Sequence, residues 1–312
     1  MKKIVLIFYL LLCACAQNNL AYITNQGDNT VSVIDIAQSK VIKTIAVGKA
    51  PVGVAVSKSL QRVFITNVDS QSISVIDTNT QKVVESIAIK GSPVGIAIAA
   101  DSKTLYVADW YSDRIIAINT NNYTEQREVI VEKAPAGLVV SPDSNTLYVA
   151  ARDSNEIAVV DTTTLKITKR IEVGKHPFGI NLSADGTTLY AVNVYSNSVS
   201  IINTKTWAQS KIKVGDHPYC AAPSAGNKTL YVTNTLDDNV AVIDLATQKT
   251  LANVEVGSTP EGIAYDVAGS RVVIASWGDN DVSIIDTKTN KLITKIKTGD
   301  KSRAFGQFVL LN

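Results

Sequence analysis

The sequence predicts an all-β protein, a seven-bladed β-propeller with four antiparallel strands in each blade. The first observation behind this prediction is a motif similar to Tyr-Val-Thr-Asn that recurs seven times. Successive copies lie 42 residues apart, except for one step of 41 residues between the fifth and the sixth. A constant period of this length is typical of one supersecondary unit copied many times. The copies begin at Tyr22, Phe64, Tyr106, Tyr148, Tyr190, Tyr231 and Val273.

The second observation is an alternation of apolar and polar residues that divides each copy into four short strands. The motif is one strand, and a segment similar to Val-Ser-Val-Ile-Asp, as at residues 31–35, is the next. A turn and a third strand lead to a Gly-x-x-Pro-x-Gly loop, for example at residues 174–179. The strand after this loop is rich in small residues. We expect it to lie innermost, where the blades crowd around the axis.

The third observation concerns the two ends of the chain. The repeat begins with a motif strand near Leu20 and finishes with an inner-type strand at residues 305–311. We expect this last strand to complete the first blade, because closing the ring removes free sheet edges.

The composition is consistent with one large domain and excludes several classes of function. Of the 312 residues, 46% are apolar and 19% are charged, which is enough to fill a packed core. Without Lys2 and Lys3, the 30 Lys and Arg residues become 28 and equal the 28 Asp and Glu residues. This balance does not indicate nucleic-acid binding. The sequence contains no Gly-rich phosphate loop, no serine nucleophile elbow and no Cys-x-x-Cys-His haem attachment motif.

The first residues predict export from the cytoplasm. Two lysines precede an apolar run at residues 4–12, and Ala14 and Ala16 supply small residues at a cleavage site. We expect a signal peptide at residues 1–16 and a single propeller domain at residues 17–312, in the periplasm or secreted. The alternative is a lipoprotein acylated at Cys15, the one membrane attachment that the sequence indicates. Apart from Cys13 and Cys15 in the leader, the chain has only Cys220.

These motifs resemble those of the YVTN family of secreted β-propeller repeat proteins over residues 20–312. The resemblance rests on the motif strands, the segments at residues 31–35 and 73–77, the Pro-Gly loops and the ending at residues 303–308. It implies a seven-bladed extracytoplasmic propeller of bacterial type and implies no particular reaction.

Differences between the copies indicate where a binding site lies, because residues shared by all copies build the scaffold. Two loops are expected on one rim of the ring, the Pro-Gly loop and the loop after the motif. Both histidines of the protein, His176 and His217, precede the loop proline, where the other copies have Ala50, Ser92, Ala134 and Thr259. Phe178 and Tyr219 follow the proline, and Cys220 replaces a glycine.

Three interpretations of this cluster remain open. His176, His217 and Cys220 could supply ligands to Zn or Cu. The same side chains could contact a ligand without chemistry, or they could only be turn and packing residues. No carboxylate is expected beside either histidine from the repeat pattern.

The loop after the motif also varies, with Trp110, Tyr111, Arg152, Tyr195 and Trp277 at places where the first copy is bland. Exposed Trp, Tyr and Arg are typical of binding hot spots. The alternative is that Trp110 or Trp277 is a wedge between blades.

The sequence therefore favours an extracytoplasmic binding or scaffold module that uses one variable rim, with a protein, a glycan or a small molecule as partner; it identifies no cofactor and leaves that question open. The first alternative is a lyase-like enzyme, or a protein that holds a metal, a quinone or a tetrapyrrole, with His176 and His217 as catalytic or ligand candidates. The second is a structural component of the cell envelope or surface.

Overall fold

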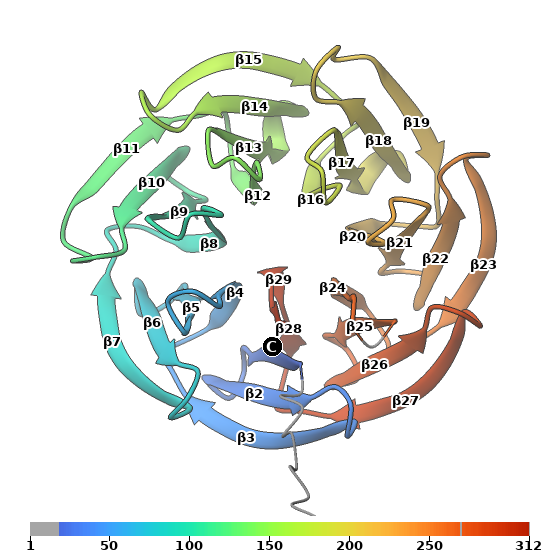
Figure 1. The fold of residues 1–312 in the computed structure, drawn as a ribbon, viewed down its shortest axis with the longest axis horizontal. Helices are drawn as coiled ribbons and strands as arrows, with labels where there is room; N and C mark the ends of the chain where they lie inside the picture. The colour runs from blue at the N-terminus through green and yellow to red at the C-terminus, as the bar shows by residue number, and fades with distance from the viewer. Residues whose placement is uncertain (1–18, 269, 312) are drawn as a thin grey trace, which may run out of the picture.

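Seven antiparallel sheets surround a central axis in the computed structural model, which describes residues 19–268 and 270–311 (Figure 1). The predicted seven-bladed propeller with four strands per blade is confirmed. The signal peptide predicted for residues 1–16 lies outside the described residues, as do Cys13 and Cys15. No helix in the described part of the chain is long and apolar enough to cross a bilayer.

Each blade runs outward from the axis in chain order. The inner strands are β4 (Pro51–Ser57), β8 (Pro93–Ile98), β12 (Pro135–Val140), β16 (Pro177–Leu182), β20 (Pro218–Pro223) and β24 (Pro260–Asp266). The motif strands are β1 (Leu20–Asn25), β5 (Arg62–Asn67), β9 (Thr104–Asp109), β13 (Thr146–Ala151), β17 (Thr188–Asn193), β21 (Thr229–Asn234) and β25 (Arg271–Ser276).

The third and fourth strands complete the blades. The third strands are β2 (Thr30–Asp35), β6 (Ser72–Asp77), β10 (Arg114–Asn119), β14 (Glu156–Asp161), β18 (Ser198–Asn203), β22 (Asn239–Asp244) and β26 (Asp281–Asp286). The outer strands are β3 (Lys40–Ala46), β7 (Lys82–Ala88), β11 (Gln126–Ile130), β15 (Lys166–Glu172), β19 (Gln209–Lys213), β23 (Lys249–Glu255) and β27 (Lys291–Lys297). Two short 3-10 turns follow motif strands, η1 (Arg152–Ser154) and η2 (Val194–Ser196).

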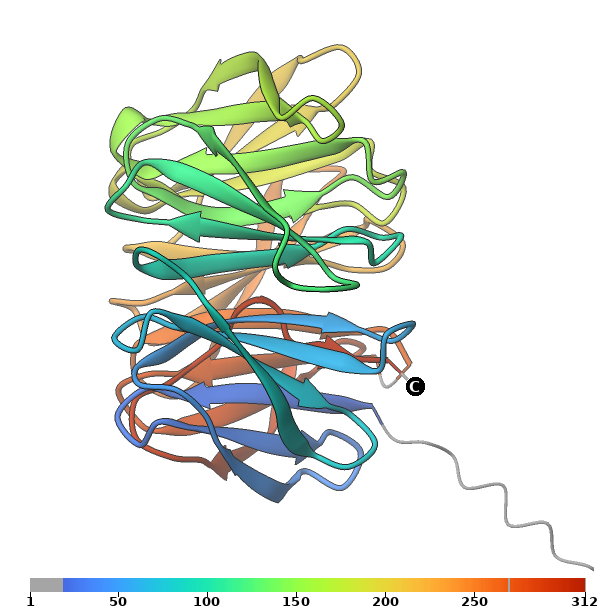
Figure 2. The same ribbon diagram turned by 90° about the vertical axis from the view of Figure 1, so that its left-hand side faces the viewer.

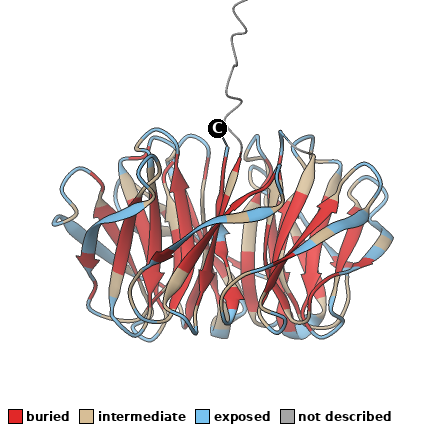
Figure 3. Ribbon diagram, turned by 90° about the horizontal axis from the view of Figure 1, so that it is seen from below, coloured by how far each residue is buried: buried red, intermediate tan, exposed pale blue. Residues whose placement is uncertain are grey.

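The hydrophobic core lies between the faces of neighbouring blades. Inner and motif strands are largely buried, whereas the outer strands and the loops at both ends are exposed (Figure 3). The aromatic residue that opens each motif is part of this core. Tyr190, for example, is 1% exposed, donates a hydrogen bond from its hydroxyl to Asn227 Oδ1 at 2.6 Å, and has its pKa raised to about 12 by burial.

The Thr and Asn of the motif join neighbouring strands through side-chain hydrogen bonds. Thr24 Oγ1 donates to Val52 O at 3.1 Å, and Thr66 Oγ1 donates to Val94 O at 2.9 Å, each joining a motif strand to the inner strand of the next blade. The buried Asn25 donates from Nδ2 to two hydroxyls of the adjacent strand at 2.9 Å. Because buried polar groups need such partners, the motif is explained as scaffold.

The C-terminal residues close the first blade, as predicted, but they do so in three short strands rather than one. β28 (Ser302–Arg303) and β30 (Val309–Leu310) pair with β1, whereas β29 (Phe305–Gln307) leaves the blade and pairs in parallel with β4. Gly306 permits this detour, because its φ is +96° and a Cβ there would lie 2.6 Å from Val54 O. The strand β29 therefore projects into the centre of the ring (Figure 1).

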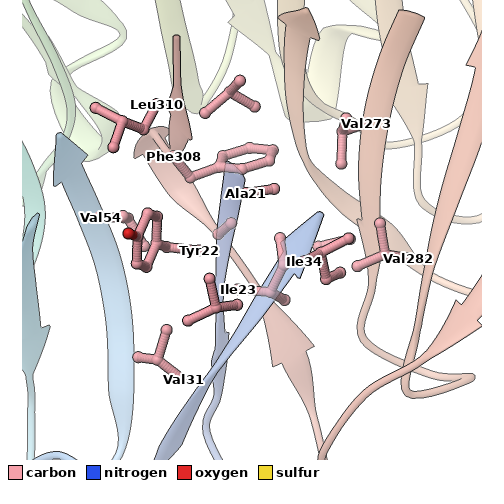
Figure 4. Packing of buried hydrophobic residues seen from close by; sticks show 14 of the residues in the cluster. Ala21, Tyr22, Ile23, Val31, Ile34, Val54, Val273, Val282, Phe308 and Leu310 are labelled. Atoms are coloured by element: carbon pink, nitrogen blue, oxygen red, sulfur yellow. The ribbon is translucent and has the colours of Figure 1, made fainter. Parts of the chain in front are cut away.

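The closure has its own packed core. Phe308 and Leu310 pack against Tyr22 and Ala21 of β1, and Val273 of the last repeat joins the same cluster (Figure 4). The C-terminus emerges on the face of the ring at which β1 begins (Figure 2). The Pro-Gly loops lie on the opposite face, which we call the loop rim.

Candidate functional site at the loop rim

The loop rim is built from two loops of each blade that are joined by backbone hydrogen bonds. Val68 N donates to Ala50 O at 3.1 Å, and Asp69 N donates to Lys49 O at 3.2 Å. The same pair of bonds joins the loop at residues 194–195 to residues 175–176, at 3.1 and 3.2 Å. The Pro-Gly loop and the loop after the motif therefore form one unit.

A second feature, which we call the latch, ties such a unit to the preceding blade, except in the blade of β8, where Ser92 N donates to Asp109 of its own blade. The backbone N–H before the loop proline donates to an Asn or Asp side chain of that blade, for example from Ala50 to Asn29 and from His176 to Asn155, both at 2.9 Å. The latched residue has a left-handed backbone, with φ of 52° at Ala50, 53° at His176 and 48° at His217. The loop backbone is thus the same whether alanine or histidine occupies the position.

The two histidines both contact one tyrosine. The ring centroid of Tyr195 lies 4.2 Å from that of His176 and 5.5 Å from that of His217. Tyr195 is 53% exposed, so this trio forms an outward-facing aromatic surface. The tyrosine ring, rather than a shared atom, joins the two imidazoles.

Each histidine also has a carboxylate neighbour, contrary to our expectation. His217 Nδ1 lies 2.9 Å from Asp216 Oδ1, and this hydrogen bond lowers the pKa of Asp216. His176 Nδ1 lies 3.7 Å from Asp153 Oδ1, too far for a hydrogen bond. Burial and the neighbouring Arg152 lower the pKa of His176, and Asp153 opposes them in part.

Below this surface, aromatic side chains close the axis. Phe178 contacts Tyr219 with ring centroids 4.2 Å apart and Phe305 of β29 at 5.1 Å, and Tyr219 lies 5.4 Å from Phe305. We call these three residues the axial plug. Trp110 packs 5.9 Å from Phe178, and the Arg152 guanidinium lies 5.1 Å above the Trp110 ring.

A buried ion pair borders the plug. The Arg303 guanidinium donates two hydrogen bonds to the Glu261 carboxylate, both at 2.8 Å. Arg303 also lies 5.2 Å from the Phe305 ring and 6.0 Å from the Trp277 ring. Burial raises the pKa of Glu261, and Arg303 opposes that shift. We did not predict this pair, although Glu261 follows a loop proline and so occupies the same position as Phe178.

The structure separates the ten predicted site residues into groups. Trp110, Arg152, Phe178 and Tyr219 meet at the plug, and His176, Tyr195 and His217 meet above it. Trp277 lies beside Arg303, and Tyr111 projects outward with 80% of its surface exposed. Cys220 lies below the plug, where it lines an axial cavity of 460 Å³, and burial raises the pKa of its thiol. Among residues 19–268 and 270–311, no three His, Cys, Asp or Glu side chains gather closely enough to hold a metal ion.

Comparison with known proteins places this chain in a family. Residues 8–179 match the family model described as the cytochrome D1 heme domain. The chain belongs to this family. No curated protein matches the sequence.

Solved structures share the fold at low sequence identity. Hydrazine synthase of Kuenenia stuttgartiensis is 21% identical, with a TM-score of 0.78 over 85% of this chain and 92% of that chain. A functionally unknown protein from Desulfotomaculum acetoxidans is 15% identical, with a TM-score of 0.79 over 93% of this chain and 100% of that chain. At these identities the likeness concerns the fold.

The family name raises the question of whether the residues of this chain fit a haem. Haem carries anionic propionates and usually takes a His, Cys, Met or Tyr ligand. Neither histidine lines the axial cavity, because both lie on the other side of the plug; of the usual ligand types, the described lining holds Cys220 and Tyr265. None of the described residues that line the cavity is a Lys, Arg or His that could balance the propionates. The arrangement therefore does not fit a histidine-ligated haem in the centre of the ring.

Proposed function

We propose that this protein is an extracytoplasmic propeller of the YVTN repeat type that binds a protein partner through the exposed side chains of its loop rim. One observation carries the proposal. Ala50 makes the same latch, with the same backbone, as His176. The scaffold thus does not require an imidazole at this position. Binding of a partner explains why two neighbouring blades have His176 and His217 where the other blades have other residues.

The spacing of exposed apolar side chains favours a protein over a glycan or a small molecule. The second residue of the loop after the motif is Tyr111, Tyr195 or Leu236 in three blades, exposed by 80%, 53% and 61% respectively. The corresponding residues of the other blades are Gly27, Asp69, Asp153 and Gly278.

The three exposed side chains are too widely distributed for one small ligand. Equivalent positions in a seven-bladed ring are about 51° apart, so Tyr111 and Leu236 are separated by about 150° around the axis. A protein interface, which covers about 800 Å² on each partner, can contact all three. Aromatic residues with neighbouring Arg, such as Trp110 with Arg152, are also typical of interface centres.

The location follows from the leader. Residues 1–16 have the pattern of a signal peptide, and acylation at Cys15 would add an anchor. This part of the proposal rests on the sequence alone, and the mass of the mature N-terminus tests it. We assign no reaction to the rim.

Capture from an envelope extract of the native cell, followed by measurement of affinity for the identified partner, tests the proposal. We expect the triple variant Tyr111→Ala, Tyr195→Ala, Leu236→Ala to weaken binding by more than about tenfold. Asp69→Ala is the matched control, because it changes the same loop position in a bland blade. Equal affinity of the triple variant and the wild type, at unchanged melting temperature, would refute the rim assignment.

The family match supports a second function, that of holding a tetrapyrrole. The positions of His176 and His217 outside the cavity count against it. Addition of hemin to the purified protein separates the two, because a ligated haem gives an absorption band that is lost on His176→Ala. A bound haem with that dependence would favour the second function, and an unshifted hemin spectrum would favour the first.

A further inference from the structure

The axial cavity is a separate space that the rim does not use. It has a volume of 460 Å³, within the range of about 300–1,000 Å³ that is typical of small-molecule sites. Five consecutive residues of β8 and of β12, at 94–98 and 136–140, line it. At about 3.3 Å per strand residue, the four steps from the first to the fifth of these residues give the lined part of each strand a length of about 13 Å.

One end of the cavity is closed. Phe178 comes from β16 and Phe305 from β29, which arrive from different sides of the axis, and their rings lie 5.1 Å apart. Both side chains are at least 94% buried, at 4% and 6% exposure. A molecule therefore cannot enter from the loop rim without displacing the plug.

The other end reaches the face at which the chain begins and ends. The turns after the inner strands line this mouth, together with Val267 after β24 and Leu311 after β30. These two side chains are 49% and 36% exposed. Exposed large aliphatic residues beside a cavity favour entry of an apolar molecule.

The chemistry of the lining excludes ions. Among residues 19–268 and 270–311, no Asp, Glu, Lys, Arg or His lines the cavity. A charged ligand would therefore lose its hydration without gaining a counter-charge, so its binding is unfavourable. The two carboxamides are Asn181 and Gln307. Asn181 already donates to Ala221 O at 3.2 Å and accepts from Leu182 N at 2.9 Å.

Gln307 is the remaining amide. It lies on β29, which pairs with β4 on one side only, so the other edge of β29 faces the axis. Gln307 is exposed although it lies in the centre of the ring, because it borders the cavity. A side-chain amide in this position can donate to, or accept from, a carbonyl or hydroxyl group of a bound molecule.

We propose that the axial cavity binds an uncharged, largely apolar small molecule, which enters at the Val267 and Leu311 mouth and is hydrogen-bonded by Gln307. This site is independent of the rim. Its occupant is chemically distinct from haem, because an anionic ligand has no counter-charge in this cavity.

Fluorescence titration of the intact mature protein with Nile red, a neutral dye, tests the proposal against anilinonaphthalene sulfonate, an anionic dye. We expect saturable binding of Nile red at one site and at least about tenfold weaker binding of the anionic dye. Gln307→Trp fills the cavity and should weaken Nile red binding by about tenfold or more. Gln126→Trp, at an exposed position of the outer strand β11, is the matched control and should leave it unchanged.

A second variant keeps the test valid if Gln307→Trp does not fold. Val267→Lys charges the mouth at an exposed position, and we expect it too to weaken Nile red binding. The triple rim variant should bind Nile red as the wild type does. Nile red affinity that is unaffected by a folded cavity or mouth variant, or equal affinity for both dyes, would overturn the proposal.

Discussion

Two sectors of the loop rim have the same backbone and different side chains. In the sector around β4, the latched residue is Ala50 and the loop beside it presents Val68 and Asp69. In the sector around β16 and β20, the latched residues are His176 and His217, which both contact Tyr195. We call this second sector the aromatic sector.

The comparison separates scaffold from site within one molecule. The bland blades that share the latch, such as that of β4, show what the fold alone requires at a given position, since their hydrogen bonds and dihedral angles are the same. What the aromatic sector adds is thus not needed for folding. The following predictions test how far this separation holds.

The largest effect is expected at the buried ion pair, where the copies differ most in polarity. The position after the loop proline is Ala136 in a bland blade and Glu261 here. Glu261→Ala leaves the Arg303 charge buried without its partner and should lower the free energy of unfolding by about 3 kcal/mol, as measured by urea denaturation. Glu255→Ala, on the exposed outer strand β23, is the control and should change it by less than about 0.5 kcal/mol.

A loss below about 1 kcal/mol for Glu261→Ala would mean that the pair is solvated and does not hold the rim together. Glu261→Gln retains a hydrogen-bond acceptor for Arg303 and should fall between the wild type and the alanine variant.

The second effect concerns the latch, whose contribution to the free energy of unfolding should be equal in the two sectors. Asn29→Ala and Asn155→Ala each remove the acceptor of one backbone hydrogen bond, so each should cost about 1 kcal/mol of unfolding free energy. Only Asn155→Ala should also weaken capture of the partner, because it releases the loop that carries His176. Unequal losses of stability would show that the two sectors do not share one scaffold.

The repeat sufficed to predict the ring, the strand order and the closing strand, because these depend on periodicity and on residues that are close in sequence. It also directed attention to Phe178, His176 and Tyr195, which deviate from the other copies. The pair of Glu261 with Arg303 was not predicted, although Arg303 stands one repeat of 42 positions after Glu261, because Ser302 replaces the loop proline that marks this position in the other copies.

The cavity was missed for a different physical reason. Its closed end depends on Phe305, and its free amide on Gln307, and both are on β29. A repeat alignment places this strand in the first blade, whereas Gly306 directs it across to β4. A single backbone turn with positive φ therefore determined a feature that no periodic pattern contains.

The third effect is a reciprocal exchange at the latched position. His176→Ala and Ala50→His should each change the free energy of unfolding by less than about 0.5 kcal/mol, because the left-handed backbone accepts both residues. His176→Ala should weaken partner binding, and Ala50→His should leave it unchanged, since Asp69 rather than a tyrosine lies beside Ala50. Thermal unfolding and the capture assay measure the two outcomes. A destabilisation of His176→Ala by about 2 kcal/mol would make the histidine a scaffold residue.

The smallest effect is a dependence of stability on pH that only the aromatic sector should show. Burial and Arg152 lower the pKa of His176 from its usual 6.5. The unfolded chain therefore binds the proton more readily, so this histidine contributes stability above about pH 6.5 and loses it as the pH falls through the folded pKa. The urea midpoint should decrease more steeply between pH 7 and pH 5 for the wild type than for His176→Ala, by a small margin because the imidazole is partly exposed. Parallel pH profiles of these two proteins would contradict this prediction, because they would show that solvent screens the His176 ring and that it contributes no pH-dependent stability.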